Sequence, residues 1–149
     1  MKKYILLDNI RSLLNVGAIF RTVDGAGFDK VILTGFTPTP PRKEISKTAI
    51  GAEQYVDWEY YEDPVEILKE LKKQGFKIIT VEQTQKSIDF RKLEIRNENI
   101  CLVLGNEIEG VNKKIVELSD YCVELPMLGQ KQSLNVATTA GIMLYRFLD

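Results

Sequence analysis

Three short segments of the chain bring hydroxyl, amide, carboxylate and guanidinium groups close to glycines. They are Asn15-Val16-Gly17-Ala18-Ile19-Phe20-Arg21-Thr22, Leu104-Gly105-Asn106-Glu107-Ile108-Glu109-Gly110, and Leu125-Pro126-Met127-Leu128-Gly129 with the following Ser133-Leu134-Asn135-Val136. The last of these opens a predicted helix, where the first backbone N–H groups are unpaired and Ser or Asn can cap the helix or hold a ligand. A cap alone is an ordinary feature, so the interest lies in the combination of the three segments.

The middle segment follows the apolar run Ile100–Leu104, which places it at the carboxyl end of a predicted strand, where α/β sheets usually bind ligands. Its two glycines match the ends of a phosphate loop. However, Val111-Asn112 stands where such a loop has Lys and Ser or Thr, which argues against a nucleoside triphosphatase. Gly25-Ala26-Gly27 is no dinucleotide fingerprint, because it ends a predicted helix. Glu107 and Glu109 in this loop could take part in ligand binding, or they could simply be exposed acidic residues of a turn.

The chain has no histidine, which removes the commonest general base and a frequent metal ligand. Catalysis would have to use Arg21, Glu107 or the Ser133 hydroxyl, and we expect no metal site. Arg21 lies at the edge of an apolar helical stripe, so it could simply extend to solvent. Small residues around it favour instead the close approach of a backbone or ligand; they are Gly17, Ala18, Thr22 and Gly25.

Composition indicates one soluble domain over residues 1–149, with 44% hydrophobic and 28% charged residues and no run long enough to span a bilayer. The N-terminal apolar stretch ends too early for a signal peptide, so we expect a first strand and a cytoplasmic protein. Cys101 and Cys122 lie in apolar runs and are expected to pack as reduced thiols.

A net charge of −1 does not by itself indicate a nucleic-acid partner. Arg42, Lys43 and Lys47 cluster in a predicted loop after Pro38-Thr39-Pro40-Pro41, and Lys2, Lys3, Arg11 and Arg21 lie near the N-terminus. Acidic residues concentrate between Glu53 and Glu70. A basic patch and scattered solvated cations remain equally good interpretations of this pattern.

Apolar runs alternate with amphipathic stretches, which predicts an open, mostly parallel α/β sheet flanked by helices. The expected strands are Tyr4–Leu7, Lys30–Thr34, Tyr55–Trp58, Lys77–Val81, Ile100–Leu104 and Tyr121–Leu125. The first helix should run from near Asn15 to Ala26 and end at Gly27. A second begins after the cap Asp63 with Pro64 in its first turn, and Gly75 follows its end. The last has its apolar stripe at Val136, Ala140, Met143 and Phe147.

Taken together, the three segments resemble the three motifs of the TrmH/SpoU branch of the SPOUT class of RNA methyltransferases. The first motif corresponds to Asn15, Gly17-Ala18 and Arg21-Thr22, the second to Gly105-Asn106-Glu107 and Gly110, and the third to Pro126-Met127, Gly129 and Ser133-Leu134-Asn135. The segment Ile45–Glu53 resembles the connector of that branch. The resemblance covers essentially the whole chain.

The resemblance implies a C-terminal deep trefoil knot and a homodimer in which the first and last helices pack together and complete each site. It also implies S-adenosyl-L-methionine as cofactor and methylation of a ribose 2′-hydroxyl in RNA, with tRNA preferred to rRNA. The implied cofactor residues are Leu104, Gly105, Asn106, Gly110, Leu125, Pro126, Met127, Leu128, Ser133 and Leu134. The implied catalytic residues are Arg21 at the centre, with Asn15, Glu107, Ser133 and Asn135 around it.

Arg21 can act as a proton acceptor or as an orienting clamp, and a free guanidinium holds its proton tightly, so the clamp is at least as good an interpretation. The rival functions are a non-catalytic knotted RNA-binding or dimerisation module and a flavodoxin-like nucleotide-binding domain. Exposed apolar residues would support the dimer, for which Ile19, Ile142 and Leu144 are the candidates. Since we expect a single domain without a separate RNA-binding domain, a helper protein is a further possible partner.

Overall fold

The computed structural model describes residues 1–148 as one α/β unit around a seven-stranded sheet with the order β3-β2-β1-β6-β4-β7-β5. The strands are β1 (Lys3–Asp8), β2 (Lys30–Thr34), β3 (Asp57–Tyr61), β4 (Lys77–Val81), β5 (Ile88–Asp89), β6 (Ile100–Leu104) and β7 (Tyr121–Glu124). The helices are α1 (Leu13–Ala26), α2 (Lys43–Ala49), α3 (Pro64–Lys73), α4 (Lys113–Leu118) and α5 (Val136–Arg146), with short 3₁₀ turns η1 (Ala52–Gln54) and η2 (Phe90–Lys92). Every strand pair is parallel, which confirms the predicted sheet.

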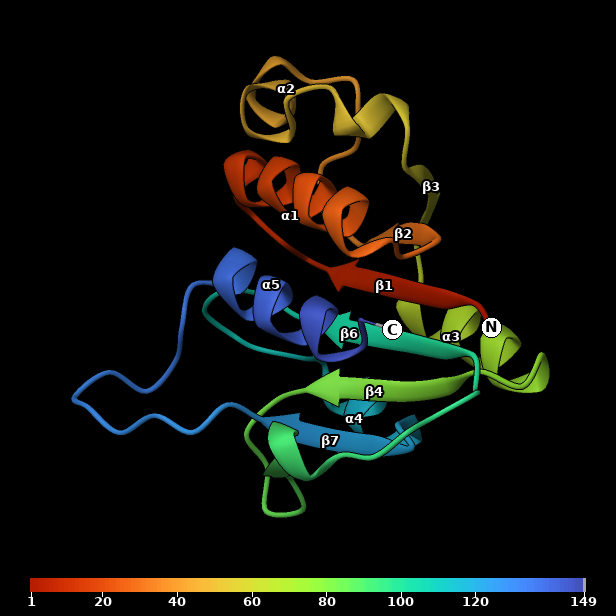
Figure 1. Cartoon of the computed structure of the whole chain (residues 1–149), viewed down its shortest axis with the longest axis vertical. Helices are drawn as coiled ribbons and strands as arrows, with labels where there is room; N and C mark the ends of the chain where they lie inside the picture. The colour runs from red at the N-terminus through yellow and green to blue at the C-terminus, as the bar shows by residue number, and fades with distance from the viewer. Residues whose placement is uncertain (149) are drawn as a thin grey trace.

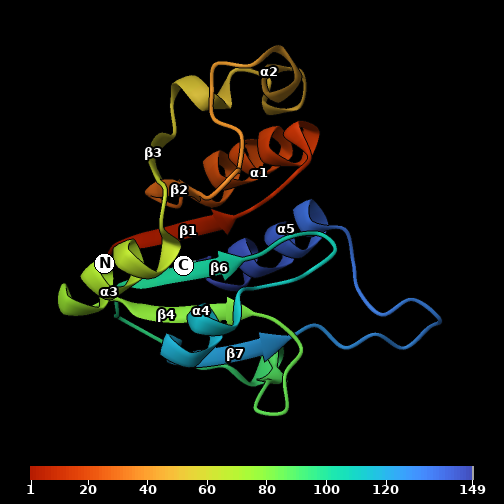
Figure 2. The ribbon, with the colours of Figure 1, turned by 180° about the vertical axis from the view of Figure 1, so that it is seen from behind.

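The helices form a layer on each face of the sheet. Helices α1 and α5 lie side by side on one face, with α2 packed against the outer side of α1 (Figure 1). Helices α3 and α4 cover the opposite face, as the reverse view shows (Figure 2). Because both faces are covered, the central strands can be apolar along their length, and all residues of β6 are buried.

The helix boundaries follow from local capping. Helix α1 begins at Leu13, two residues before the expected start, because the Ser12 hydroxyl accepts a hydrogen bond from the Asn15 N–H at 3.1 Å. It ends at Gly27, whose left-handed φ of 73° costs glycine little. The Asp63 carboxylate accepts from the Val65 N–H at 2.9 Å, which confirms the predicted cap of α3.

Two expectations about local structure are wrong. The predicted loop containing Arg42, Lys43 and Lys47 is largely helix α2, which forms because Ile45 and Ala49 are one turn apart and both bury against α1. The third strand is Asp57–Tyr61 rather than Tyr55–Trp58, since the chain before Asp57 is still in the η1 turn, where the Val56 N–H donates to the Ala52 carbonyl.

Two expectations about exposure also change. Ile19 and Leu144 are fully buried within the single chain, in the core between the sheet and the helices, so they provide no surface for a dimer. Cys101 is buried as expected, but Cys122 is only half-buried. Burial raises the pKa of the Cys122 thiol, and the nearby Glu82 carboxylate raises it further.

The strand order reverses direction between β1 and β6, because the chain first builds outward through β2 and β3 and later returns to the other side of β1. Ligands of open α/β sheets bind in the crevice that such a reversal leaves at the carboxyl strand ends. The loops after β1, β4, β6 and β7 all meet at this edge of the sheet (Figures 1 and 2). Among residues 1–148, no helix is long and apolar enough to cross a membrane.

Candidate active site

A cleft of about 940 Å³ lies at this edge, lined by the loops that follow four neighbouring strands and by the start of α5. Such a volume falls within the range of small-molecule sites, roughly 300–1,000 Å³. Its lining residues are Arg11, Ser12, Asn15, Val81, Glu82, Gln83, Leu104, Gly105, Asn106, Glu107, Ile108, Glu109, Gly110, Val111, Glu124, Leu125, Met127, Gln132, Ser133, Leu134, Asn135, Val136 and Thr139. The cleft therefore unites most of the second and third sequence motifs with the start of the first.

Asn106 gives the loop after β6 its shape. Its side-chain oxygen accepts from the N–H groups of Ile108 and Glu109, each at 2.9 Å, and its Nδ2 donates to the Asn9 carbonyl at 2.8 Å. The backbones of Asn106 and Gly110 also bond to each other. The side chain thus folds the loop on itself and ties it to the loop after β1.

Glu107 binds backbone rather than standing exposed in a turn. Its Oε1 accepts from the Arg11 N–H at 2.9 Å and its Oε2 from the Ser12 N–H at 3.0 Å. Burial acts to raise the pKa of Glu107, but these N–H groups, its own backbone N–H and the Asn15 side chain outweigh it and lower the pKa below the usual value. Glu107 is therefore an ionised link between the β6 loop and the start of α1.

Asn135 joins the third motif to this network. It caps α5 through its Oδ1, which accepts from Ala137 and Thr138 N–H at 2.8 and 3.2 Å. Its Nδ2 donates to the Asn15 Oδ1 at 3.3 Å, so hydrogen bonds run from Asn135 through Asn15 to Glu107. Three of the predicted catalytic residues are thereby in direct contact, although they come from three distant segments.

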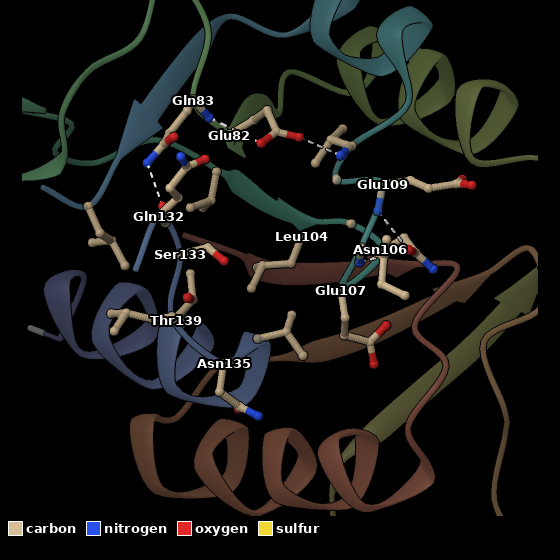
Figure 3. A pocket seen from close by; sticks show the side chains of 18 of the residues that line it. Glu82, Gln83, Leu104, Asn106, Glu107, Glu109, Gln132, Ser133, Asn135 and Thr139 are labelled. Carbon is tan, nitrogen blue, oxygen red and sulfur yellow. Dashed lines mark hydrogen bonds between the residues drawn. The ribbon is translucent and has the colours of Figure 1, made fainter. Parts of the chain in front are cut away.

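Ser133 lies two residues before the cap, so it is not the helix cap that its position in the sequence also allowed. It lines the cleft, and its side chain points into the open space toward Leu104 (Figure 3). A hydroxyl in this position is free to meet a ligand.

Arg21 lies apart from the cleft. It is exposed on α1 and lines a second hollow between α1, α2 and α5, with Ala18, Thr22, Gly25, Lys47, Thr48, Ile50 and Tyr145. Within one chain, the structure therefore does not bring Arg21 together with the other four predicted catalytic residues. The small residues around Arg21 are explained in part, because a Cβ on Gly17 would overlap the Ile45 carbonyl of α2.

Eight of the ten predicted cofactor residues line the cleft, namely Leu104, Gly105, Asn106, Gly110, Leu125, Met127, Ser133 and Leu134. Pro126 and Leu128 do not, and Leu128 is 98% exposed at the protruding β7–α5 loop. At the base of the loop after β6, position 105 requires glycine. A Cβ there would come within 2.5 Å of the Gly110 carbonyl oxygen and 2.7 Å of the Val111 Cα.

The sequence interpretation missed several lining residues, above all Glu82 and Gln83 after β4 and Glu124 at the end of β7. Their position directly at the carboxyl ends of predicted strands was the available signal. The described lining carries carboxylates from Glu82, Glu107, Glu109 and Glu124 but a single cation, Arg11. In residues 1–148, no group of three or more Cys, Asp or Glu side chains is placed to hold a metal ion.

The residues that line the cleft suit a ligand that is part apolar and part cationic. Leu104, Leu125 and Leu134 offer apolar surface, the bent loops offer backbone groups, and the carboxylates offer negative charge. An adenosine joined to a sulfonium amino acid has these properties, so the residues present fit S-adenosyl-L-methionine.

Comparison with known proteins agrees with the fold and the motifs. The chain is 34% identical over 143 residues to a tRNA (guanosine(18)-2′-O)-methyltransferase of Aquifex aeolicus, covering 95% of this chain and 66% of that protein. It is 36% identical over 141 residues to an uncharacterized tRNA/rRNA methyltransferase of Borreliella burgdorferi, covering 95% of this chain and 61% of that protein. The chain thus spans less than two thirds of the length of these curated relatives.

Solved structures match over nearly the whole chain. The AdoMet-bound rRNA methyltransferase from Sinorhizobium meliloti superposes with a TM-score of 0.91 at 26% identity, over 97% of this chain and 55% of that one. The A. aeolicus TrmH/SpoU tRNA modifying enzyme superposes with a TM-score of 0.88 at 32% identity, over 97% and 73%. Residues 2–145 match the SpoU rRNA Methylase family. The chain belongs to that family, the SPOUT-class RNA methyltransferases that its three motifs resemble.

Proposed function

We propose that this chain transfers a methyl group from S-adenosyl-L-methionine to a ribose 2′-hydroxyl of RNA. The observation that carries the proposal is the hydrogen-bond network of Asn135, Asn15 and Glu107 at the rim of a cleft that also presents the Ser133 hydroxyl. A scaffold has no need of such polar groups at an open strand edge. The cofactor would supply an electrophilic methyl group, and the residues of the chain would have to do the rest.

Methyl transfer to a hydroxyl is an in-line displacement, so the protein must align the 2′-oxygen and assist the loss of its proton. Leu104, Gly105 and Leu134 would hold the cofactor, and Ser133 would orient the ribose. Glu107 is fully engaged with backbone N–H groups, which suits an ordering role for the loops better than a role as proton acceptor. Asn15 then has its side chain fixed from both sides.

Arg21 would act from a second copy of the chain. The surface around it combines exposed apolar side chains, Leu14 at 46% and Tyr145 at 50%, with the small residues Ala18 and Gly25, which suits helix packing. Its hollow carries Arg21 and Lys47 and no carboxylate, whereas the cleft is rich in carboxylates. A homodimer across α1 and α5 would bring cations to a site that lacks them and would let Arg21 clamp a ribose or phosphate oxygen.

The trefoil knot belongs to the same proposal. Its support is the path of the chain, which leaves β7, extends in the long β7–α5 loop and returns to pack α5 against α1 and strand β6 (Figure 1). For the substrate we propose tRNA before rRNA, because the A. aeolicus relative is named for a tRNA guanosine. A cytoplasmic location fits such a substrate, and we include a helper protein as a further partner in the proposal.

The direct test has two parts. Calorimetry should show that S-adenosylhomocysteine binds the purified protein without RNA or metal. Incubation with methyl-labelled cofactor and either tRNA or rRNA transcripts, followed by mapping of alkali-resistant linkages, should then show 2′-O-methylation. Binding without transfer to any RNA would favour the non-catalytic module, and absence of binding would refute the cofactor assignment.

Arg21→Ala separates binding from chemistry. Because Arg21 lies outside the cleft of its own chain, cofactor affinity should change little, while methylation should fall by orders of magnitude. Arg21→Lys keeps the charge but loses the planar fork, so it should recover little of the rate. Full activity of Arg21→Ala would remove this residue from the site.

Mixed dimers test whether Arg21 acts across the interface. If it does, a dimer of one Arg21→Ala chain and one Ser133→Ala chain contains one site with both residues intact and regains activity that neither parent variant has. If Arg21 acts within its own chain, every site in the mixed dimer lacks one residue. Recovery of close to half the wild-type rate per dimer is the expected result.

A further inference from the structure

Glu82 and Gln83 leave the end of β4 and contact both loops of the cleft, although neither belongs to any of the three motifs. The Glu82 Oε2 accepts a hydrogen bond from the Val111 N–H at 2.6 Å, at the end of the β6 loop. The Gln83 Nε2 donates to the Gln132 carbonyl at 3.0 Å, next to Ser133 in the β7–α5 loop. At the edge of the cleft, both contacts join segments that the sequence separates widely (Figure 3).

The backbone that carries these side chains is itself fixed. The Glu82 N–H donates to the Val123 carbonyl at 3.0 Å, and the Glu82 carbonyl accepts from the Ser87 hydroxyl at 2.5 Å. The Thr84 N–H donates to the same Ser87 oxygen at 2.8 Å. The turn after β4 is therefore fixed by its own hydrogen bonds, and from it the side chains of Glu82 and Gln83 can hold the two loops in place.

Gly110 leaves room for the Glu82 carboxylate. Its φ of +75° favours glycine, and a Cβ at this position would collide with the Glu82 Oε2. The base of the β6 loop is close-packed at the same point, because Gly105 lies against the Gly110 carbonyl and Val111. A carboxylate that binds the Val111 N–H thus determines where the loop closes.

We propose that Glu82 and Gln83 are positioning residues that hold the β6 loop and the β7–α5 loop at the spacing the cofactor requires. The inference rests on the proposed function, since it assigns these two loops to the cofactor. Glu82 contributes most, because a hydrogen bond to an ionised acceptor is stronger than one between neutral groups. Gln83 adds a weaker, solvent-exposed contact.

The experiment compares Glu82→Ala, Glu82→Gln and Gln83→Ala with Glu94→Ala, an exposed glutamate outside the cleft. Glu82→Ala should weaken S-adenosylhomocysteine binding by at least about tenfold, the equivalent of one charge-assisted hydrogen bond. Glu82→Gln keeps an acceptor oxygen but loses the negative charge, so it should give a smaller loss of affinity, of about threefold. The KM for cofactor should rise in Glu82→Ala while the KM for RNA stays unchanged, a split that general loss of stability does not produce.

Hydrogen exchange gives a readout without cofactor. In Glu82→Ala the amide of Val111 should exchange faster, whereas the amides of β6 should keep their protection. Gly110→Ala perturbs the same contact from the other side and should give the same faster exchange. Wild-type affinity and exchange in Glu82→Ala would overturn the inference, and so would equal losses in the Ala and Gln variants. Failure of the wild-type protein to bind the cofactor would instead overturn the proposed function.

Discussion

Replacing Glu107 by alanine should destabilise the protein, because its carboxylate satisfies two backbone donors. The Arg11 N–H lies 2.9 Å from Oε1 and the Ser12 N–H lies 3.0 Å from Oε2. Hydrogen bonds to charged groups contribute about 1.5–3 kcal/mol each when they are buried. Glu107 is only partly buried, so water can take over part of this role, and we expect a total loss of about 1–3 kcal/mol.

The pH dependence gives this prediction its sharpest form. The folded-state pKa of Glu107 lies below the usual 4.5, so the carboxylate stabilises the fold fully above pH 4.5 and loses this effect as pH falls through the folded-state pKa. Glu107→Gln keeps the size and one acceptor oxygen but cannot ionise. The stability difference between wild type and Glu107→Gln should therefore be constant from about pH 8 to pH 5 and shrink below pH 4.5.

Urea unfolding at a series of pH values measures both quantities, with Glu94→Ala as a control for the loss of an exposed carboxylate. Cofactor affinity measured on the same samples reports whether the β6 loop stays in place. A difference between wild type and Glu107→Gln that is as large at pH 3 as at pH 7 would refute the ionised link. Unchanged stability of Glu107→Ala would show that the two N–H groups find equivalent partners in water.

Two further substitutions test the packing and the capping that support the site. Gly17→Ala should cost about 1–3 kcal/mol in thermal or urea unfolding because its Cβ would overlap the Ile45 carbonyl. At Gly141 in α5 a Cβ would make only an ordinary contact with Thr22 of α1, so Gly141→Ala should be neutral or stabilise by up to about 1 kcal/mol. Asn135→Ala should lose about 1 kcal/mol of helix-capping energy and also methyltransferase activity. Asn135→Asp should keep the cap but lose activity, because an aspartate cannot donate a hydrogen bond to Asn15. Full methylation by Asn135→Asp would contradict this role of Asn135.

The elements with strong local signals could be predicted from the sequence. Helix α3 carries a capping Asp63, a first-turn Pro64 and an apolar stripe, and all of these act within ten residues of one another. Helix α2 has only Ile45 and Ala49 to bury, and its position depends on the absence of a side chain at Gly17, which is distant in sequence. A helix of this length is set by tertiary packing rather than by its own propensity.

In the candidate site too, some features could be predicted from local sequence and others depend on the folded structure. Its polar side chains could be named from the motifs, but the partners of Glu107 are backbone N–H groups of Arg11 and Ser12, which any residue type can supply. The part played by Glu82 depends on β4 lying next to β6 in the sheet, an adjacency that chain order does not reveal. The position of Glu82 at the end of a predicted strand marks it as a candidate lining residue, but its backbone partner Val111 can be identified only from the folded structure.

The separation of Arg21 from the cleft follows from where α1 stands. Asn15 lies on the side of α1 that meets α5 and the cleft, whereas Arg21, nearly two turns later, faces the hollow beside α2. Two of the four cleft carboxylates, Glu82 and Glu107, already bind backbone N–H groups, but Glu109 and Glu124 remain to repel a phosphate backbone. On the proposed function, a single chain could therefore bind the cofactor but would hold RNA poorly. The cations of the second hollow would then have to come from another copy of the chain, so on the proposed function we expect catalysis, but not cofactor binding, to depend on dimerisation.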